Sequence, residues 1–218
     1  KIIKPEMGDF KDFDTNKAPY SYRNSTVNIV AGDGVTGYGA GEYVSLGVVP
    51  GTTAADDVVV ITWYDTNART LYYSYNTTPL TDRRGIVNQF GADDGWFAPV
   101  PVFEGKDYEY AGEYCKIAVD KNGGIHIAAY DPVNLDLVYA YAKSYNSGFT
   151  TCVVDSNGVV GSNLTLDVAL NGSKISPYIG YYATSCIKPK IAFYAGETQE
   201  NAAELTHGFS SVPEDGVD

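Results

Sequence analysis

The stretch GEYCKIAVDKNGGIHIAAYDPVNLDLVYAY, from Gly112 to Tyr141, decides the fold that the sequence predicts. It divides into three β-rich runs separated by two turn signals. The first run ends at Asp120 in DKNGG, a composition typical of a tight hairpin. The second ends at Asp131-Pro132, where Asp accepts a local backbone hydrogen bond and Pro presets φ. The stretch therefore predicts three short antiparallel strands.

Variants of this stretch recur along the chain. Anchored on the end of the second strand, at Asp14, Asp65, Asp131 and Ala183, the copies are 51, 66 and 52 residues apart. A fourth strand at 149–154 completes the copy that begins at Gly112. Four strands in about 50 residues are typical of a β-propeller blade. The other strands match too: Gly41-Glu42-Tyr43, Gly112-Glu113-Tyr114 and Gly161-Ser162-Asn163 begin first strands, and Tyr20-Ser21-Tyr22, Tyr73-Ser74-Tyr75, Tyr139-Ala140-Tyr141 and Phe193-Tyr194-Ala195 lie in third strands.

The sequence thus predicts an all-β chain, in which residues 1–218 form one β-propeller domain or part of one. We expect four-stranded antiparallel blades, about three of them full, with partial edge blades. Their predicted extents are a partial blade at 12–31, blades at 41–103 and 112–155, and an incomplete blade at 161–196 with no evident outer strand. A short helix is expected at 198–205. Because propellers close with four to eight blades, the chain is a fragment, is completed by another chain, or closes as a small ring.

The repeat resembles a bacterial propeller repeat written roughly G-x-Y-x-S-L-x-V-D-x-x-G-x-x-H-I-x-Y-Y-D, followed by L-x-Y-A and V-D-S. It is carried here by Gly112, Tyr114, Ala118-Val119-Asp120, Gly123, His126-Ile127, Tyr130-Asp131, Leu137, Tyr139-Ala140 and Val154-Asp155-Ser156, and it covers about residues 12–196. The resemblance implies a sialidase-like fold in a secreted or cell-surface protein, and it implies a compartment more than an activity. The arginine setting and the Asp-box of sialidases are absent.

Composition excludes several classes of partner. The chain is tyrosine-rich, with 19 Tyr, and acidic, with a net charge of −12. Such a charge argues against nucleic acid and against anionic membranes, both of which need a basic surface. No apolar run reaches the length of a membrane span. Cys115 and Cys152 are expected on the first and fourth strands of one blade, roughly 14 Å apart at ~4.8 Å per strand, which is too far for a disulfide.

No motif in the sequence carries recognisable chemistry, so we predict no catalytic residue, no metal site and no cofactor. His126 is expected to be packed and structural. The aspartates at 14, 65 and 131 are expected to cap turn amides; as a ring they would offer oxygen ligands to Ca²⁺, but Ala183 interrupts the ring. Glu42 and Glu113 recur at strand starts. They are either strand-start residues near solvent or, if they face a central channel, a cation site or a glycoside-hydrolysing pair.

Exposed tyrosines and the long polar loop at 77–95 are the expected contacts. Tyrosine gives a large contact area at low entropic cost, and long loops in compact folds often carry function. We expect a secreted or cell-surface propeller that binds a protein or glycan, or serves as a scaffold. One alternative is a glycan-active, sialidase-like or lyase-like enzyme with catalytic residues partly outside this chain; another is a structural subunit whose propeller a second chain completes. The candidate binding residues are Asp82, Arg83, Arg84, Asp93, Asp94 and Trp96.

Overall fold

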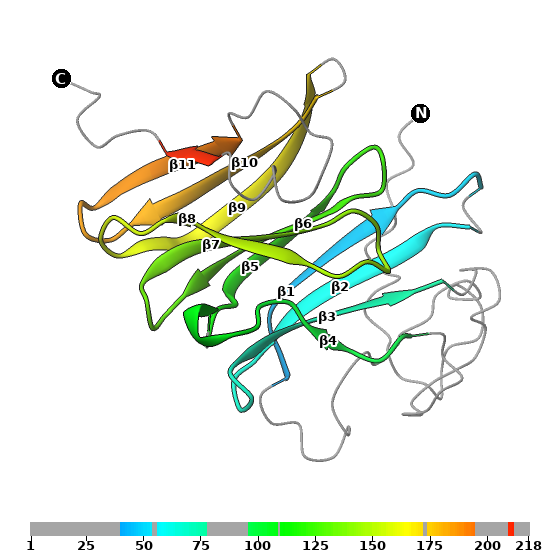
Figure 1. The fold of residues 1–218 in the computed structure, drawn as a ribbon, viewed down its shortest axis with the longest axis horizontal. Coiled ribbons are helices and arrows are strands. Elements are labelled where there is room, and N and C mark those ends of the chain that lie inside the picture. Colours follow the sequence, from blue (N-terminus) through cyan, green and yellow to red (C-terminus); the bar gives the residue numbers. More distant parts are fainter. Residues whose placement is uncertain are drawn as a thin grey trace, which may run out of the picture.

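The computed structural model describes residues 40–53, 56–77, 96–108, 110–171, 174–194 and 209–211. In these ranges the chain forms three antiparallel sheets of four strands each, and one short 3-10 helix at Lys106–Tyr108 (Figure 1). The partial blade expected at 12–31, the helix expected at 198–205 and residues 78–95 of the long loop lie outside the described residues. In the described part of the chain, no helix is long and apolar enough to cross a membrane.

Each sheet is built from four strands that follow one another in the sequence. The first sheet contains β1 (Ala40–Val49), β2 (Val58–Asp65), β3 (Thr70–Asn76) and β4 (Val100–Pro101). The middle sheet contains β5 (Glu113–Val119), β6 (Ile125–Asp131), β7 (Asp136–Ala142) and β8 (Thr150–Asp155). The third sheet contains β9 (Val160–Asn171), β10 (Lys174–Ala183), β11 (Lys188–Tyr194) and β12 (Phe209–Ser211).

The prediction that the third repeat lacks an outer strand is wrong. The short strand β12 pairs antiparallel with β11, with Ala192 opposite Ser211 and Tyr194 opposite Phe209. This strand follows the end of β11 by 14 residues, outside the predicted limit of 196, and its three residues carry no repeat signal. The third sheet therefore has the same four-strand order as the other two.

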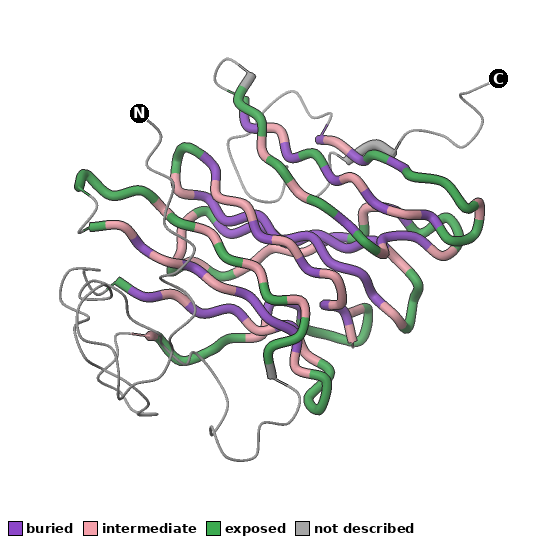
Figure 2. The backbone as a smooth tube through the Cα atoms, turned by 180° about the vertical axis from the view of Figure 1, so that it is seen from behind, coloured by how far each residue is buried: buried purple, intermediate pink, exposed green. Residues whose placement is uncertain are grey.

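The sheets stack in chain order, with their first strands β1, β5 and β9 next to one another (Figure 1). All seven residues of β6 are buried, because the middle sheet is covered on both faces. Successive residues of a strand point to opposite faces. Accordingly, Ile127 packs into a core shared with the first sheet, whereas Ala128 packs into a core shared with the third. Figure 2 shows this burial concentrated where the sheets meet.

The turn between the second and third strands repeats in all three sheets. Its last residue has a left-handed backbone: φ is 51° at Arg69, 66° at Leu135 and 58° at Ile187. In the first two copies an aspartate caps the turn. Asp65 Oδ1 accepts the backbone N–H groups of residues 67 and 68, and Asp131 Oδ1 accepts those of residues 133 and 134, at 2.8–3.1 Å. The predicted capping role is confirmed for both; Asp14 lies outside the described residues.

A second backbone irregularity repeats at the start of each first strand. Glycines 41, 112 and 161 have φ of 106°, 149° and 103°, and the residues two positions later, Tyr43, Tyr114 and Asn163, have φ of 50°, 56° and 48°. The pairing register of each first strand with its second strand shifts in this region. Such a β-bulge turns side chains away from the regular pleat. It is the feature that positions the candidate site.

The three cysteines are all free thiols. Cys115 packs in the core between the first and middle sheets, and Cys152 packs in the core between the middle and third sheets. The prediction that these two do not form a disulfide is confirmed. Burial raises the pKa of both thiols to about 12, so neither is a reactive thiolate near neutral pH.

Candidate functional site

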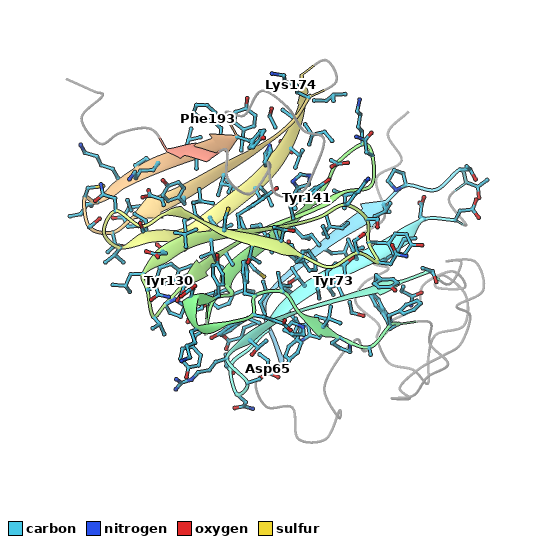
Figure 3. All side chains as sticks on the ribbon, in the orientation of Figure 1. Asp65, Tyr73, Tyr130, Tyr141, Lys174 and Phe193 are labelled. Atoms are coloured by element: carbon cyan, nitrogen blue, oxygen red, sulfur yellow. The ribbon has the colours of Figure 1, made fainter. Side chains whose placement is uncertain are left out.

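The bulges of the first and middle sheets bring four tyrosines together. The ring centroids of Tyr43 and Tyr114 lie 4.8 Å apart with the planes tilted by 43°. Tyr64 of β2 lies 6.3 Å from Tyr43, and Tyr130 of β6 lies 6.2 Å from Tyr114. Figure 3 labels Tyr130 and, at the same end of the sheets, Asp65. These four tyrosines, together with Glu42 and Glu113, are called the tyrosine rim below.

The rim has a buried floor and an accessible edge. Tyr64 and Tyr130 are buried, Tyr43, Tyr114 and Glu113 are half-buried, and Glu42 is exposed. Aromatic rings in tilted arrangements at these distances attract one another, which fixes their orientation. The sulfhydryl of buried Cys115 donates to the carbonyl oxygen of Tyr43 at 2.7 Å and holds the bulge backbone against β5. A preformed aromatic surface at the solvent boundary results.

The electrostatic field at the rim is negative. Burial, together with the charges of Glu113 and Glu42, raises the pKa of Tyr43 to about 12. Burial and the charge of Glu42 also raise the pKa of Glu113. Burial and Glu113 raise the pKa of Tyr64, and the opposing charge of Arg69 offsets only part of this. Since a tyrosine nucleophile needs a lowered pKa, Tyr43 is suited to contact rather than to nucleophilic attack.

The carboxylates of the rim have no ion-pair partner in the described part of the chain. The two ion pairs there involve Asp120 and Asp155, which belong to other networks. Arg69 is a cationic group whose charge acts on Tyr64, and its guanidinium carbon lies 5.0 Å from the ring centroid of Tyr110 in a cation–π contact. Glu42 and Glu113 are therefore placed on adjacent strands with their charges uncompensated by protein cations described in the structure.

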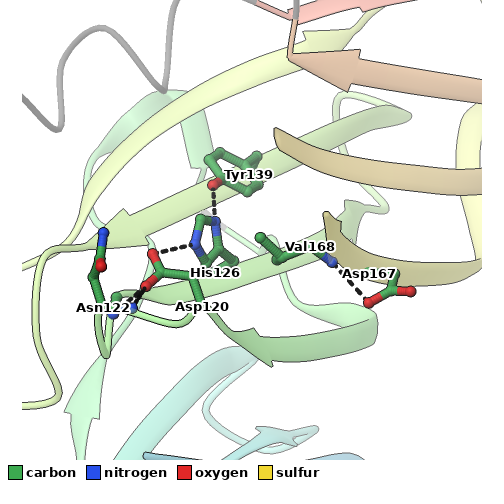
Figure 4. A network of polar contacts seen from close by, with 7 residues as sticks. Asp120, Asn122, His126, Tyr139, Asp167 and Val168 are labelled. Atoms are coloured by element: carbon green, nitrogen blue, oxygen red, sulfur yellow. Dashed lines mark hydrogen bonds and ion pairs between the residues drawn. The ribbon is translucent and has the colours of Figure 1, made fainter. Parts of the chain in front are cut away.

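A buried triad of Asp120, His126 and Tyr139 lies in the middle sheet (Figure 4). His126 Nε2 is 3.0 Å from Asp120 Oδ2, and His126 Nδ1 is 2.6 Å from the Tyr139 hydroxyl. A carboxylate only accepts, so the neutral imidazole donates from Nε2 and accepts the Tyr139 O–H at Nδ1. The set resembles a catalytic acid–histidine–hydroxyl arrangement, but His126 and Tyr139 are both 0% exposed. The prediction that His126 is packed in the core is therefore confirmed.

Protonation states in this triad follow from burial and hydrogen bonding. Burial lowers the pKa of His126, and the hydrogen bond to Asp120 opposes only part of that effect. Burial disfavours the charged form of Asp120, but the hydrogen bond from His126 and those from the amides of Gly124 and Asn122 outweigh it, so its pKa is lowered. The pair is therefore a neutral imidazole hydrogen-bonded to a carboxylate.

We expect the free energy of unfolding to fall as the pH drops below 6.5, the ordinary histidine pKa. Below this pH the histidine is protonated in the unfolded chain but stays neutral in the folded protein. The contribution of His126 to the free energy of unfolding is therefore complete above pH 6.5 and is lost at up to about 1.4 kcal/mol per pH unit below it. Urea unfolding from pH 8 to pH 5 measures this slope. His126→Gln should flatten it, and an unchanged slope in that variant would place the proton uptake elsewhere.

Of the residues predicted from the long loop, the structure describes only Trp96. Asp82, Arg83, Arg84, Asp93 and Asp94 lie outside the described residues. Trp96 is half-buried and pairs its backbone with Asn76 in an isolated β-bridge on the first sheet. Glu42 and Glu113, which recurrence singled out, do lie at the site. Exposed tyrosines were expected as contacts, but these particular ones were not singled out, although the repeated Gly-Glu-Tyr triplet carried the signal.

No metal centre is evident within the described ranges, where no three His, Cys, Asp or Glu side chains are grouped as ligands. The arrangement can instead offer aromatic faces and carboxylate oxygens to a ligand at the solvent boundary. Comparisons with protein-family models, with curated proteins and with solved structures find no match to this chain.

Proposed function

We propose that this chain is a secreted or cell-surface β-propeller module whose tyrosine rim binds a protein or glycan partner. The propeller assignment is supported by three successive four-stranded sheets that stack with their first strands adjacent. It is also supported by apolar side chains on the two outer sheets. Val44, Leu46 and Val48 of β1 and Tyr178 and Ile191 of the third sheet are 42–57% exposed, as expected of faces on which further blades pack.

One observation carries the binding role: the bulge does not require tyrosine. In the third repeat the same position is Asn163, with φ of 48°, preceded by Ser162 rather than glutamate. Asparagine tolerates the left-handed region, whereas a bulky side chain there is strained. The first two repeats nonetheless place Tyr43 and Tyr114 at this backbone angle. Asparagine would adopt this backbone angle with less strain, so the presence of tyrosine at both positions indicates a functional role for the ring.

The repeat itself supplies the test. We expect a variant carrying Glu42→Ser, Tyr43→Asn, Glu113→Ser and Tyr114→Asn to fold with the same three sheets, because these are the residues that the third repeat uses. Its binding to arrays of defined glycans and synthetic peptides should fall at least about tenfold relative to the unmodified protein, the equivalent of about 1.4 kcal/mol. Circular dichroism and urea unfolding check the fold. Equal binding by both proteins would contradict a role for the rim.

A second candidate function is glycoside cleavage, which one observation favours. Glu113 has a raised pKa, as a general acid needs, and the charge of a second carboxylate, Glu42, acts on it. Turnover of chromogenic glycosides tests this candidate. Activity that disappears in both Glu113→Gln and Glu42→Gln would favour an enzyme, and absence of turnover across the panel leaves the binding role as the better explanation.

A further inference from the structure

Building on the proposed binding role, we propose that the tyrosine rim takes an organic cation, and that its partner is a basic protein presenting an ammonium or guanidinium side chain. The proposal rests on the placement of carboxylates, on the aromatic surface between them, and on a contact of the same chemistry already present beside the rim.

The charges around the rim are mostly negative. Glu42 and Glu113 lie on it, and Asp131 and Asp136 act on Tyr130 from the neighbouring turn. Among the charges that act on Tyr43, Tyr64 and Tyr130, Arg69 supplies the one positive charge, and it acts on Tyr64. Asp131 already accepts turn amides, and neither glutamate has an ion pair with a described residue. Glu113 is half-buried, so a cation beside it would offset part of the cost of removing its carboxylate from water.

The aromatic surface suits an organic cation better than a metal ion. Ammonium and guanidinium groups bind ring faces at about 6 Å or less from the centroid. Arg69 makes that contact with Tyr110 at 5.0 Å, so the protein's own guanidinium already lies on a tyrosine next to the rim. Calcium takes six to eight oxygen ligands. The described residues provide no group of three or more acidic, histidine or cysteine ligands.

The negative electrostatic potential of the rim also indicates which class of macromolecule binds there. Nucleic acids, sulfated glycans and acidic peptides would bring like charge to Glu42 and Glu113, which opposes association. A neutral glycan would use the rings but would leave the carboxylates unpaired. A lysine or arginine side chain uses both. A basic protein is thus the partner whose chemistry fits every element of the rim.

Choline and its neutral isostere 3,3-dimethylbutan-1-ol provide the first test, since they share shape and differ in charge. Titration into the full chain is followed by NMR of the tyrosine ring resonances. We expect choline to shift the rings of Tyr43 and Tyr114 and to bind at least tenfold more tightly than the isostere. A lysine-containing peptide should bind in the same way, and its ε-acetylated form should lose most of that affinity.

Variants separate charge from packing. Glu113→Gln should weaken choline binding about fivefold or more, and Glu104→Gln, an exposed glutamate outside the rim, should leave it unchanged. Tyr43→Phe should retain binding because the ring remains, and Tyr43→Leu should lose it. Binding should also weaken as the pH falls through the raised pKa of Glu113, with Glu42, Asp131, Asp136 and Arg69 as the other charges near the rim.

Equal affinity for choline and the isostere, or no shift of the rim tyrosines, would overturn the cation proposal. A different result would contradict the proposed binding function. If array binding depends on the rim but the rim ligand proves to be a neutral glycan, the binding role stands and the cation proposal falls. If neither choline nor any array ligand depends on the rim, both fall.

Discussion

Replacing Asp155 with alanine is expected to lower the free energy of unfolding by about 3–5 kcal/mol, the range for breaking a buried ion pair. Asp155 Oδ2 accepts the Tyr181 hydroxyl at 2.6 Å and lies 2.9 Å from Lys190 Nζ, while Oδ1 accepts the backbone N–H of Asn157 at 2.9 Å. Asp155 and Lys190 are only 6% and 8% exposed. The substitution therefore removes the carboxylate paired with a buried ammonium group, at the point where the middle and third sheets join.

A double-mutant cycle isolates this effect. Lys190→Met removes the buried cation and keeps the side-chain volume, so the double variant Asp155→Ala/Lys190→Met should be more stable than Asp155→Ala alone. Urea unfolding at pH 7 measures all four proteins. Coupling of at least about 1 kcal/mol between the two sites is expected for groups in direct contact, and strictly additive effects would show that the pair is not coupled.

Replacing Gly161 with alanine should lower the free energy of unfolding by roughly 3 kcal/mol, through a steric clash added to backbone strain. Its φ is +103°, and a Cβ there would lie 2.9 Å from the Cα of Leu137, a backbone atom that cannot rotate away. The left-handed angle alone costs about 1–2 kcal/mol. The substitution should therefore disrupt the packing of β9 against β7.

Gly41 is the matched control for this prediction. It occupies the same position in the first repeat with φ of +106°, but a Cβ there meets nothing within 4 Å. Gly41→Ala should therefore show the cost of the backbone strain alone, about 1–2 kcal/mol. Thermal unfolding of both variants gives the comparison. If the two substitutions cost the same, the close approach of Gly161 to β7 contributes nothing measurable.

The strands were predictable because local signals define them. The turn at Asp120 to Gly124 and the capping Asp131 lie within single hairpins, and β6 lies between these two turn signals, as expected. The strand β12 was not predictable, since three residues carry no period. Neither was the polar partnership of Asp120 with His126, because the sequence showed Asp120 only as a turn residue.

The candidate site was only partly predictable for a related reason. Glu42 and Glu113 were identified because they recur at the same repeat position, and recurrence is visible in the sequence. The rim itself depends on Tyr43 meeting Tyr114 across 71 positions of sequence, which requires β1 to lie against β5. It also depends on left-handed angles at tyrosines, which residue type alone would not suggest. Propensity describes one strand at a time, whereas the rim is built from four strands in two sheets.

The consecutive order of strands within each sheet has a consequence for how the protein folds during synthesis. Every pairing partner in a sheet is the adjacent strand in sequence. The first three strands of each sheet therefore pair over short connections at small entropic cost, whereas β4 and β12 follow longer connections. The first sheet can form on the ribosome before the third has been translated. The face of the first sheet that packs against β5 stays exposed until the middle sheet has been synthesised. The face of the middle sheet that contains Leu137 then stays exposed until β9 has been synthesised. Each stage thus exposes one apolar face for a limited time, and its duration is set by the rate of translation.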